Sequence, residues 1–296
     1  MQKQSSFKGN SENGTLYLVP TPIGNLQDMT YRGVETLRTV QLIASEDTRN
    51  TQKLLNHFEI KTPQKSLHEH NFKERVPELI HLLQQGVSVA QVSDAGMPSI
   101  SDPGHELVVA CIAAAIPVVA LPGPTAGLTA LIASGLTPQP NYFYGFLPRK
   151  KSEQRNVLTA LKNETATLIF YESPYRLKQT IMNLAEVFGS RQAVVCRELT
   201  KVHEEYLRGT LEELATYLIE NTVKGECCLL VAGFNKSDDA TKAAIERPAL
   251  TFKEQVESLI ESGMKPNAAI KVVAQNNQVK KQIVYKDYHE INESVE

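Results

Sequence analysis

The fold is decided by residues 87–104, VSVAQVSDAGMPSISDPG. The first six residues contain three valines and an alanine, which predicts a buried strand. The next twelve contain two glycines and two prolines, a composition typical of a long turn. A helix is expected to follow over 104–115. An apolar strand that ends in a turn and leads into a helix is the repeating unit of a parallel α/β sheet.

Strands and helices alternate in both directions from this stretch. The pattern predicts a first α/β domain over residues 14–136 with a mainly parallel sheet, preceded by a disordered leader over 1–13. The expected strands lie at 16–19, 41–44, 65–68, 87–92 and 116–121, and the expected helices at 29–39, 49–57, 74–84, 104–115 and 125–134.

Residues 135–140, GLTPQP, have the composition of a domain boundary. A second α/β domain is expected over 137–236. Two adjacent strands within 193–208 have no helix between them, which predicts an antiparallel pair in a mixed sheet. A small helical extension is expected over 249–290.

The composition is that of an ordinary globular protein of about two domains: 296 residues, 42% hydrophobic, with a net charge of −2. Such a charge argues against a globally basic nucleic-acid binder, so any RNA contact must use local basic patches. The polar start of the chain lacks a signal-peptide core, and no apolar run reaches 18 residues, so no membrane span is expected. Four cysteines without a CxxC pair indicate reduced thiols in a cytoplasmic protein: Cys111, Cys196, Cys227 and Cys228.

Three turns follow predicted strands, at 20–25, 93–104 and 122–127. Ligands of parallel α/β sheets bind beyond the carboxyl ends of the strands, so these turns are expected to form one crevice. Taken singly, each turn has a structural alternative. Asp94 could cap a turn, and Thr125 could cap a helix. The first turn is not GxGxxG, so a dinucleotide site is not expected.

Charged clusters near strand ends predict an RNA-binding rim, in which cations hold phosphates and aromatic rings stack on bases. The alternative is that each cluster is a solvated face or a local ion pair. His68 and His70 share one side of a strand pattern, but no third ligand is evident and no metal is expected. The candidate RNA contacts are Arg49, Arg149, Lys150, Arg176, Arg197 and Lys201.

Nine segments in order over residues 14–234 resemble the tetrapyrrole methylase superfamily. They are LYLVPTPIGNLQDMTYR, LIASEDTR, SLHEHN, VSDAGMPSISDPG, ALPGPTA, FYGFLPRK, FYESPYR, CRELTK and GECCLLVAGF. Within the superfamily, they resemble the bacterial branch that methylates a cytidine 2′-hydroxyl in the decoding region of 16S ribosomal RNA. The first turn lacks the glycines usual in the tetrapyrrole branch, which favours RNA as substrate.

The resemblance implies two α/β domains with S-adenosylmethionine in the cleft between them, a homodimer, and RNA bound within the small ribosomal subunit. A tetrapyrrole or other small-molecule methylase, and a non-catalytic RNA-binding or ribosome-assembly protein, remain alternatives. The catalytic base is not identified. Its candidates are Glu172, Glu198 and Lys201, with Glu46 and Asp47 also possible. The expected cofactor contacts are Pro22 in the first turn and Asp94, Ala95, Ile100, Ser101, Thr125, Ala126, Tyr171, Leu199 and Cys228.

Overall fold

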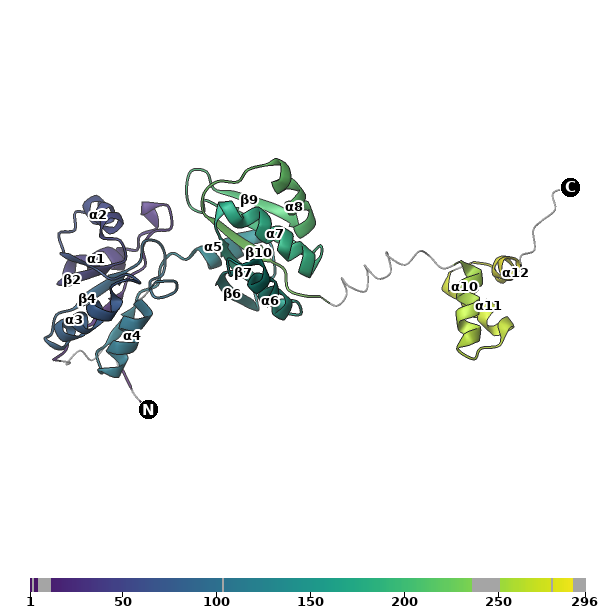
Figure 1. The fold of residues 1–296 in the computed structure, drawn as a ribbon, viewed down its shortest axis with the longest axis horizontal. Helices are drawn as coiled ribbons and strands as arrows, with labels where there is room; N and C mark the ends of the chain where they lie inside the picture. The colour runs from purple at the N-terminus through teal and green to yellow at the C-terminus, as the bar shows by residue number, and fades with distance from the viewer. Residues whose placement is uncertain (2, 5–11, 103, 236–250, 278, 290–296) are drawn as a thin grey trace. The chain divides into compact units, whose positions relative to one another are not determined.

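The computed structural model describes residues 1, 3–4, 12–102, 104–235, 251–277 and 279–289. The chain divides into two compact units, Met1–Phe234 and Asn235–Glu296 (Figure 1). Most of the expected leader lies outside the described residues, as do parts of the expected 249–290 extension.

The first sheet is built from five parallel strands in the order β3-β2-β4-β1-β5. All five strands therefore end at the same edge. This confirms the predicted parallel α/β architecture. The strands are β1 (Leu16–Leu18), β2 (Leu42–Ser45), β3 (Gln64–Ser66), β4 (Val89–Val92) and β5 (Val118–Ala120).

Alternate residues of the strands pack on opposite faces of this sheet, as the period of two requires. Leu16 of β1 packs with residues of α3 and α4, whereas Val19, just after β1, packs with residues of α1 and α2. The sheet is thus covered by helices on both faces. These helices are α1 (Tyr31–Thr39), α2 (Thr48–His57), α3 (Phe72–Gln84) and α4 (Gly104–Ala113), and a 3₁₀ turn, η1 (Leu26–Asp28), comes before α1.

The second sheet is mixed, in the order β6-β7-β10-β8-β9. Only β6 and β7 run parallel, and β8 and β9 form the antiparallel pair that the sequence predicts. The strands are β6 (Asn141–Phe146), β7 (Thr167–Glu172), β8 (Gln192–Arg197), β9 (Glu205–Thr210) and β10 (Cys227–Val231).

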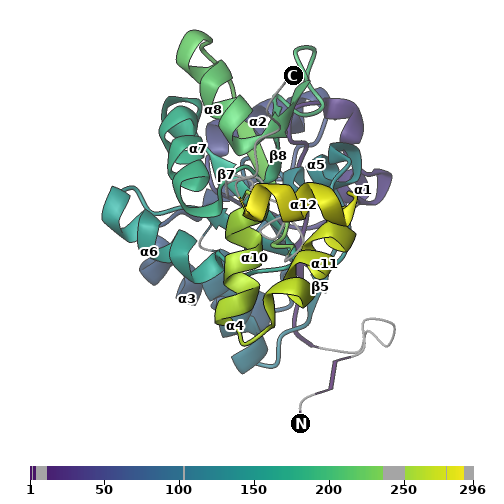
Figure 2. The same ribbon diagram turned by 90° about the vertical axis from the view of Figure 1, so that its right-hand side faces the viewer.

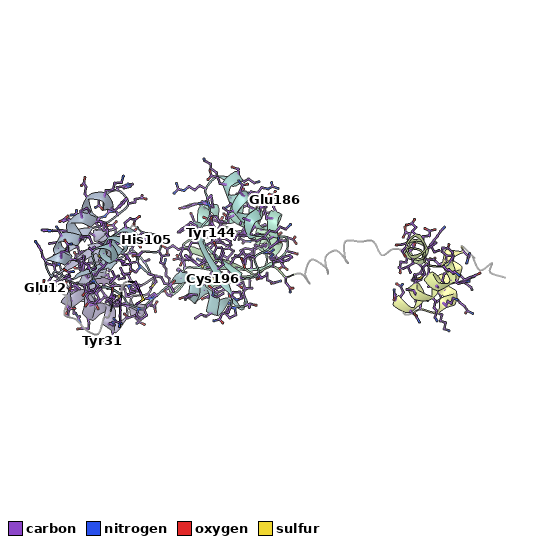
Figure 3. All side chains as sticks on the ribbon, turned by 90° about the horizontal axis from the view of Figure 1, so that it is seen from below. Glu12, Tyr31, His105, Tyr144, Glu186 and Cys196 are labelled. Carbon is purple, nitrogen blue, oxygen red and sulfur yellow. The ribbon has the colours of Figure 1, made fainter. Side chains whose placement is uncertain are left out.

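Helix α5 (Ala126–Ser134) packs on one face of the second sheet, although it follows β5 of the first sheet in the chain. Ala130 and Leu131 of α5 contact an apolar layer that includes Ile169 and Cys196; Figure 3 labels Cys196. The opposite face is covered by α6 (Lys151–Leu161), α7 (Pro174–Phe188) and α8 (Leu211–Glu220). The helix that follows the last strand of the first sheet therefore packs on the second sheet.

The second unit has its own apolar core, formed by Val256, Ile270, Val273 and Val284 among others. The three helices in the described part of this unit pack against one another (Figure 2). This agrees with the predicted helical extension. They are α10 (Phe252–Glu261), α11 (Pro266–Asn276) and α12 (Lys281–Tyr288). Across all the described residues, no helix is long and apolar enough to span a membrane.

Candidate functional site

The three turns predicted to form a crevice lie against one another at the carboxyl edge of the first sheet. Thr21 and Gly96 pair through two backbone hydrogen bonds of 3.0 Å. The Thr21 hydroxyl also donates to the Ser93 carbonyl over 3.1 Å. At Gly123, an added Cβ would lie 2.6 Å from Cβ of Pro20, so glycine permits the third turn to approach the first.

A buried polar network holds the long turn in place. Gln91 on β4 is 2% exposed, and its amide donates to Oδ1 of Asp102 over 2.9 Å. The same carboxylate accepts from the backbone N–H groups of Ser99 at 2.7 Å and Gly104 at 2.9 Å. Burial raises the pKa of Asp102, while these hydrogen bonds act against the shift. Asp102 is therefore the anchor of the turn.

Asp94 lies exposed at the end of β4, and its carboxylate contacts the start of α2. It accepts from the Asp47 backbone N–H at 3.1 Å and from the Asn50 amide at 3.0 Å. Its own N–H donates to Glu46 over 3.2 Å. A carboxylate has about four acceptor positions, so Asp94 retains capacity for a ligand hydroxyl or amine.

Glu46 is half-buried among other acids. Burial raises the pKa of its carboxyl, and the charges of Asp94, Asp102 and Asp47 add to the shift, while the hydrogen bond from the Asp94 backbone opposes it. A raised pKa makes a carboxylate a better proton acceptor near neutral pH. Of the candidate bases, Glu46 therefore has the most suitable surroundings.

A cavity of about 200 Å³ opens between the first two turns and α2. Its lining includes Pro22 and Asp94, two of the expected cofactor contacts, together with Thr21, Gly24 and Ser93. Ala95, Ile100 and Ser101 are exposed on the same long turn, and Ile100 is 60% exposed.

The remaining expected cofactor contacts meet where α5 packs on the second sheet. Ala126, Tyr171, Leu199 and Cys228 belong to one apolar cluster, which Ile23 of the first turn joins. The Tyr171 hydroxyl accepts from the Gly127 backbone N–H over 3.1 Å. Burial raises the pKa of Tyr171, so it stays a neutral phenol. Thr125 is the N-cap of α5 by position, but its hydroxyl makes no capping hydrogen bond to the helix.

Glu172, a candidate base, is enclosed by protein. Its side chain is 1% exposed. It accepts from the Ser173 N–H at 2.8 Å and the Thr180 hydroxyl at 2.6 Å, and it pairs with Arg176 at 3.2 Å. Arg176 also donates to the carbonyls of Leu147 and Pro148. This placement favours a structural role for both Glu172 and Arg176.

Glu198 and Lys201, two further candidate bases, form an ion pair. The Lys201 ammonium lies 2.9 Å from Glu198 and 3.0 Å from Glu226. The hydrogen bond from Lys201 holds the pKa of Glu198 below its ordinary value, which weakens it as a base.

The candidate RNA contacts differ in whether their side chains already pair with a carboxylate of the protein. Arg49 forms a two-point pair with Asp47, and Arg197 contacts Glu205 at 2.6 Å. Lys150 is exposed and pairs with Glu153 at 3.1 Å. Arg149 is exposed, and no ion pair is found for it among the described residues.

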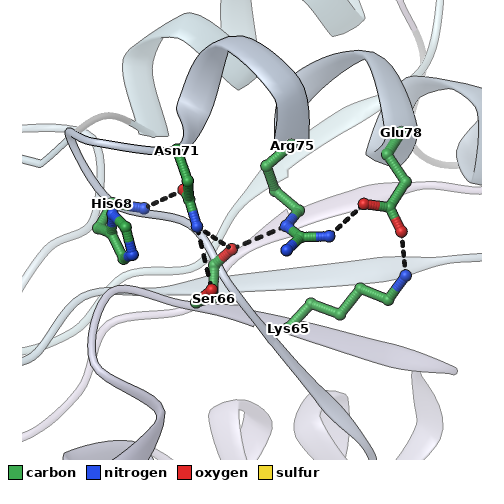
Figure 4. Close-up of polar contacts among 6 residues, drawn as sticks. All are labelled: Lys65, Ser66, His68, Asn71, Arg75 and Glu78. Carbon is green, nitrogen blue, oxygen red and sulfur yellow. Dashed lines mark hydrogen bonds and ion pairs between the residues drawn. The ribbon is translucent and has the colours of Figure 1, made fainter.

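A second network fixes the turn after β3 (Figure 4). The Asn71 side chain accepts from the His68 N–H at 2.9 Å and donates to Ser66, and Arg75 donates to the Ser66 carbonyl at 3.0 Å. Glu78 binds Lys65 and Arg75. The imidazoles of His68 and His70 lie 5.9 Å apart. In the described part of the chain, no three His, Cys, Asp or Glu residues are placed to hold a metal ion.

No sequence pattern predicts the hydrogen bond of Gln91 to the long turn or the contact of Gly24 with residues 199–201. The signal for Gln91 was a polar residue inside an otherwise apolar strand, since buried polar groups are retained where they have partners. Gly24 carried no local signal, because its neighbour in space lies about 175 residues further along the chain.

The fold and the site define a two-sheet α/β protein with a ligand crevice at the carboxyl edge of a parallel sheet. A family model described as Tetrapyrrole (Corrin/Porphyrin) Methylases matches residues 15–215. The chain belongs to this family.

Two relatives are similar over almost the whole chain, and both are named Ribosomal RNA small subunit methyltransferase I. The protein from Streptococcus pyogenes serotype M3 is 54% identical over 292 residues, 98% of this chain and 100% of that protein. The protein from Bacillus subtilis is 48% identical over 289 residues, 98% and 99% of the two chains. A crystal structure of uroporphyrin-III C-methyl transferase from Thermus thermophilus, complexed with S-adenyl homocysteine, has a TM-score of 0.54 and 17% identity, and covers 74% of this chain and 97% of that one. The last comparison shows a shared fold.

Proposed function

We propose that the protein transfers a methyl group from S-adenosylmethionine to the ribose 2′-hydroxyl of a cytidine in the decoding region of 16S ribosomal RNA. The observation that carries the proposal is the similarity over 98% of the chain to proteins named as small-subunit ribosomal RNA methyltransferases. The assembled small subunit as substrate, a homodimer and a cytoplasmic location are part of the same proposal.

The residues of the crevice fit S-adenosylmethionine. Ile23 and Tyr171 are partly exposed in the cluster that contains Leu199, and they offer apolar surface for the adenine ring. Asp94 offers free acceptor positions for ribose hydroxyls or the amino group. Gly96 and Gly123 leave room for the Ile23 side chain and the Pro20 ring, so the three turns pack closely around the crevice.

S-adenosylmethionine supplies a methyl group on a positively charged sulfur. The 2′-oxygen forms the new bond to carbon as the carbon–sulfur bond breaks, so the protein must align the oxygen behind the methyl carbon. The hydroxyl proton needs an acceptor. We assign this role to Glu46, because its half-buried carboxylate accepts from the N–H of Asp94, which lines the cavity, and because its pKa is raised. Glu172 is enclosed, and Glu198 is paired with Lys201.

The test is alkaline digestion of small-subunit RNA after incubation with protein and cofactor. A 2′-O-methyl group blocks cleavage at its own phosphodiester because that cleavage needs the free hydroxyl. One protected cytidine is expected, and a 2′-deoxy substitution there should abolish transfer. Methyl transfer to the deoxy substrate would identify a base atom as acceptor. Transfer to a porphyrin precursor and none to RNA would support the tetrapyrrole alternative.

A further inference from the structure

The loop of residues 198–201, between β8 and β9, has an unusual backbone. Glu198 has φ of 51° and Thr200 has φ of 68°, in the left-handed region that side chains with a Cβ rarely adopt. For a β-branched residue such as Thr200 this conformation is strained. Strain of this kind persists only where the surroundings impose it, and it concentrates at ligand-binding and active sites.

The surroundings that impose it centre on Glu198. Its Oε1 accepts from Lys201 Nζ and from the Glu226 N–H, each over 2.9 Å. Gly225 has φ of +89°, and an added Cβ there would lie 2.4 Å from the Glu198 carboxyl. The Thr200 N–H donates to Glu204 over 2.7 Å. The loop is therefore held at both ends.

Residues 199–201 of the loop contact the first turn at Gly24. An added Cβ at Gly24 would lie 2.5 Å from Lys201 Cγ, 2.9 Å from Thr200 Oγ1 and 3.0 Å from the Leu199 carbonyl. Thr200 Oγ1 is buried here without a hydrogen-bond partner among the described residues. Gly24 also lines the cavity that contains Pro22 and Asp94. The loop thus forms one of the contacts between the second sheet and the crevice.

We propose that Lys201 is a positioning residue: held by Glu198 and Glu226, it fixes the 198–201 loop against Gly24 and so sets the width of the cofactor crevice. Leu199 then lies beside Ile23 in the apolar cluster. Lys201 acts through the loop and does not touch the reacting atoms. This inference rests on the proposed methyl transfer.

The test compares Lys201→Gln and Lys201→Arg in the full chain. Loss of the ammonium should weaken binding of S-adenosylmethionine about ten-fold in calorimetry and raise its KM to the same extent, while kcat changes less than about two-fold, because ground-state binding is lost. Arginine should restore KM to within about three-fold, since its guanidinium can pair with both carboxylates. Lys178→Gln, an exposed lysine on α7, is the matched control and should behave as the unchanged protein.

Gly24→Ala tests the same contact from the other side. It should also raise KM for the cofactor, and the double variant with Lys201→Gln should be less impaired than the product of the two single effects, because both act on one contact. Circular dichroism checks that each variant folds. If wild-type protein is active and the Lys201→Gln variant keeps the wild-type KM, this inference is overturned. It is also overturned if the effects of Gly24→Ala and Lys201→Gln on KM multiply in the double variant. An unchanged protein without methyl transfer overturns the proposed function instead.

Discussion

The Gln91 amide donates to Asp102 over 2.9 Å, and Gly104 lies so close to it that an added Cβ would be 1.4 Å from the same nitrogen. The long turn is therefore fastened to the strand it leaves by a buried hydrogen bond, with glycine making room for the amide.

Replacement of Gln91 by leucine should destabilise the protein. The variant leaves a half-buried carboxylate short of one donor, which costs about 1–3 kcal/mol of unfolding free energy. Urea unfolding measures it. Gln192→Leu, at an exposed strand position, is the control and should change stability by less than about 0.5 kcal/mol. Equal effects of the two changes would mean that the hydrogen bond contributes nothing.

Tyr171→Phe removes one hydroxyl and leaves the ring contacts with Phe143 and Phe146 in place. The Gly127 N–H at the start of α5 loses its acceptor, so we expect a loss of about 0.5–1.5 kcal/mol in stability. Affinity for S-adenosylmethionine should fall by up to about ten-fold as the start of α5 loosens. Calorimetry decides: unchanged affinity would place Thr125 and Ala126 outside the cofactor site.

Glu46→Gln should make the protein more stable and less active. The folded-state pKa of Glu46 is raised, so wild-type stability falls as pH rises from the ordinary glutamate pKa through that raised value. The variant should match wild type below pH 4 and exceed it at pH 7, because its side chain never ionises. Urea midpoints at the two pH values measure this.

Activity of the same variant tests the proposed base. Methyl transfer at pH 7 should fall about 10²–10⁴-fold, the usual contribution of a positioned base. Full activity combined with raised stability would show that Glu46 is a buried charge without a catalytic role.

Charge reversal at Arg149 should weaken RNA binding and leave cofactor affinity unchanged. Each phosphate contact that is lost should reduce the slope of log K against log salt by about 0.7–0.9. Filter binding at several salt concentrations measures the slope. Lys178→Glu, on α7, is the control, and an equal loss with it would indicate a general charge effect and no local contact.

Much of the fold follows from local sequence patterns. The strand predicted at 41–44 matches β2, and the helix predicted at 49–57 matches α2, each to within one residue at either end. Their boundaries are set by neighbours in the chain; α2, for example, begins after Asp47, whose side chain accepts a hydrogen bond from the Arg49 N–H.

The site was predictable only where its residues follow a strand. Asp94 and Thr125 could be placed at one edge because parallel strands end together. The hydrogen bonds from Arg176 to the carbonyls of Leu147 and Pro148 could not be predicted, because they depend on how β6 and α7 approach each other. For the same reason, the sequence alone could not distinguish an enclosed Glu172 from a half-buried Glu46.

The attachment of α5 to the second sheet bears on how the chain could be divided. A cut after residue 136, at the predicted boundary, would remove α5 from the fragment that carries the second sheet and expose Ile169, Leu230 and Cys228 to water. A cut between β5 and α5 would leave the cover in place. Fragment complementation should therefore succeed with a break near residue 122 and give aggregated product with one near 137. Helix α5 thus follows the first sheet in the chain and packs on the second.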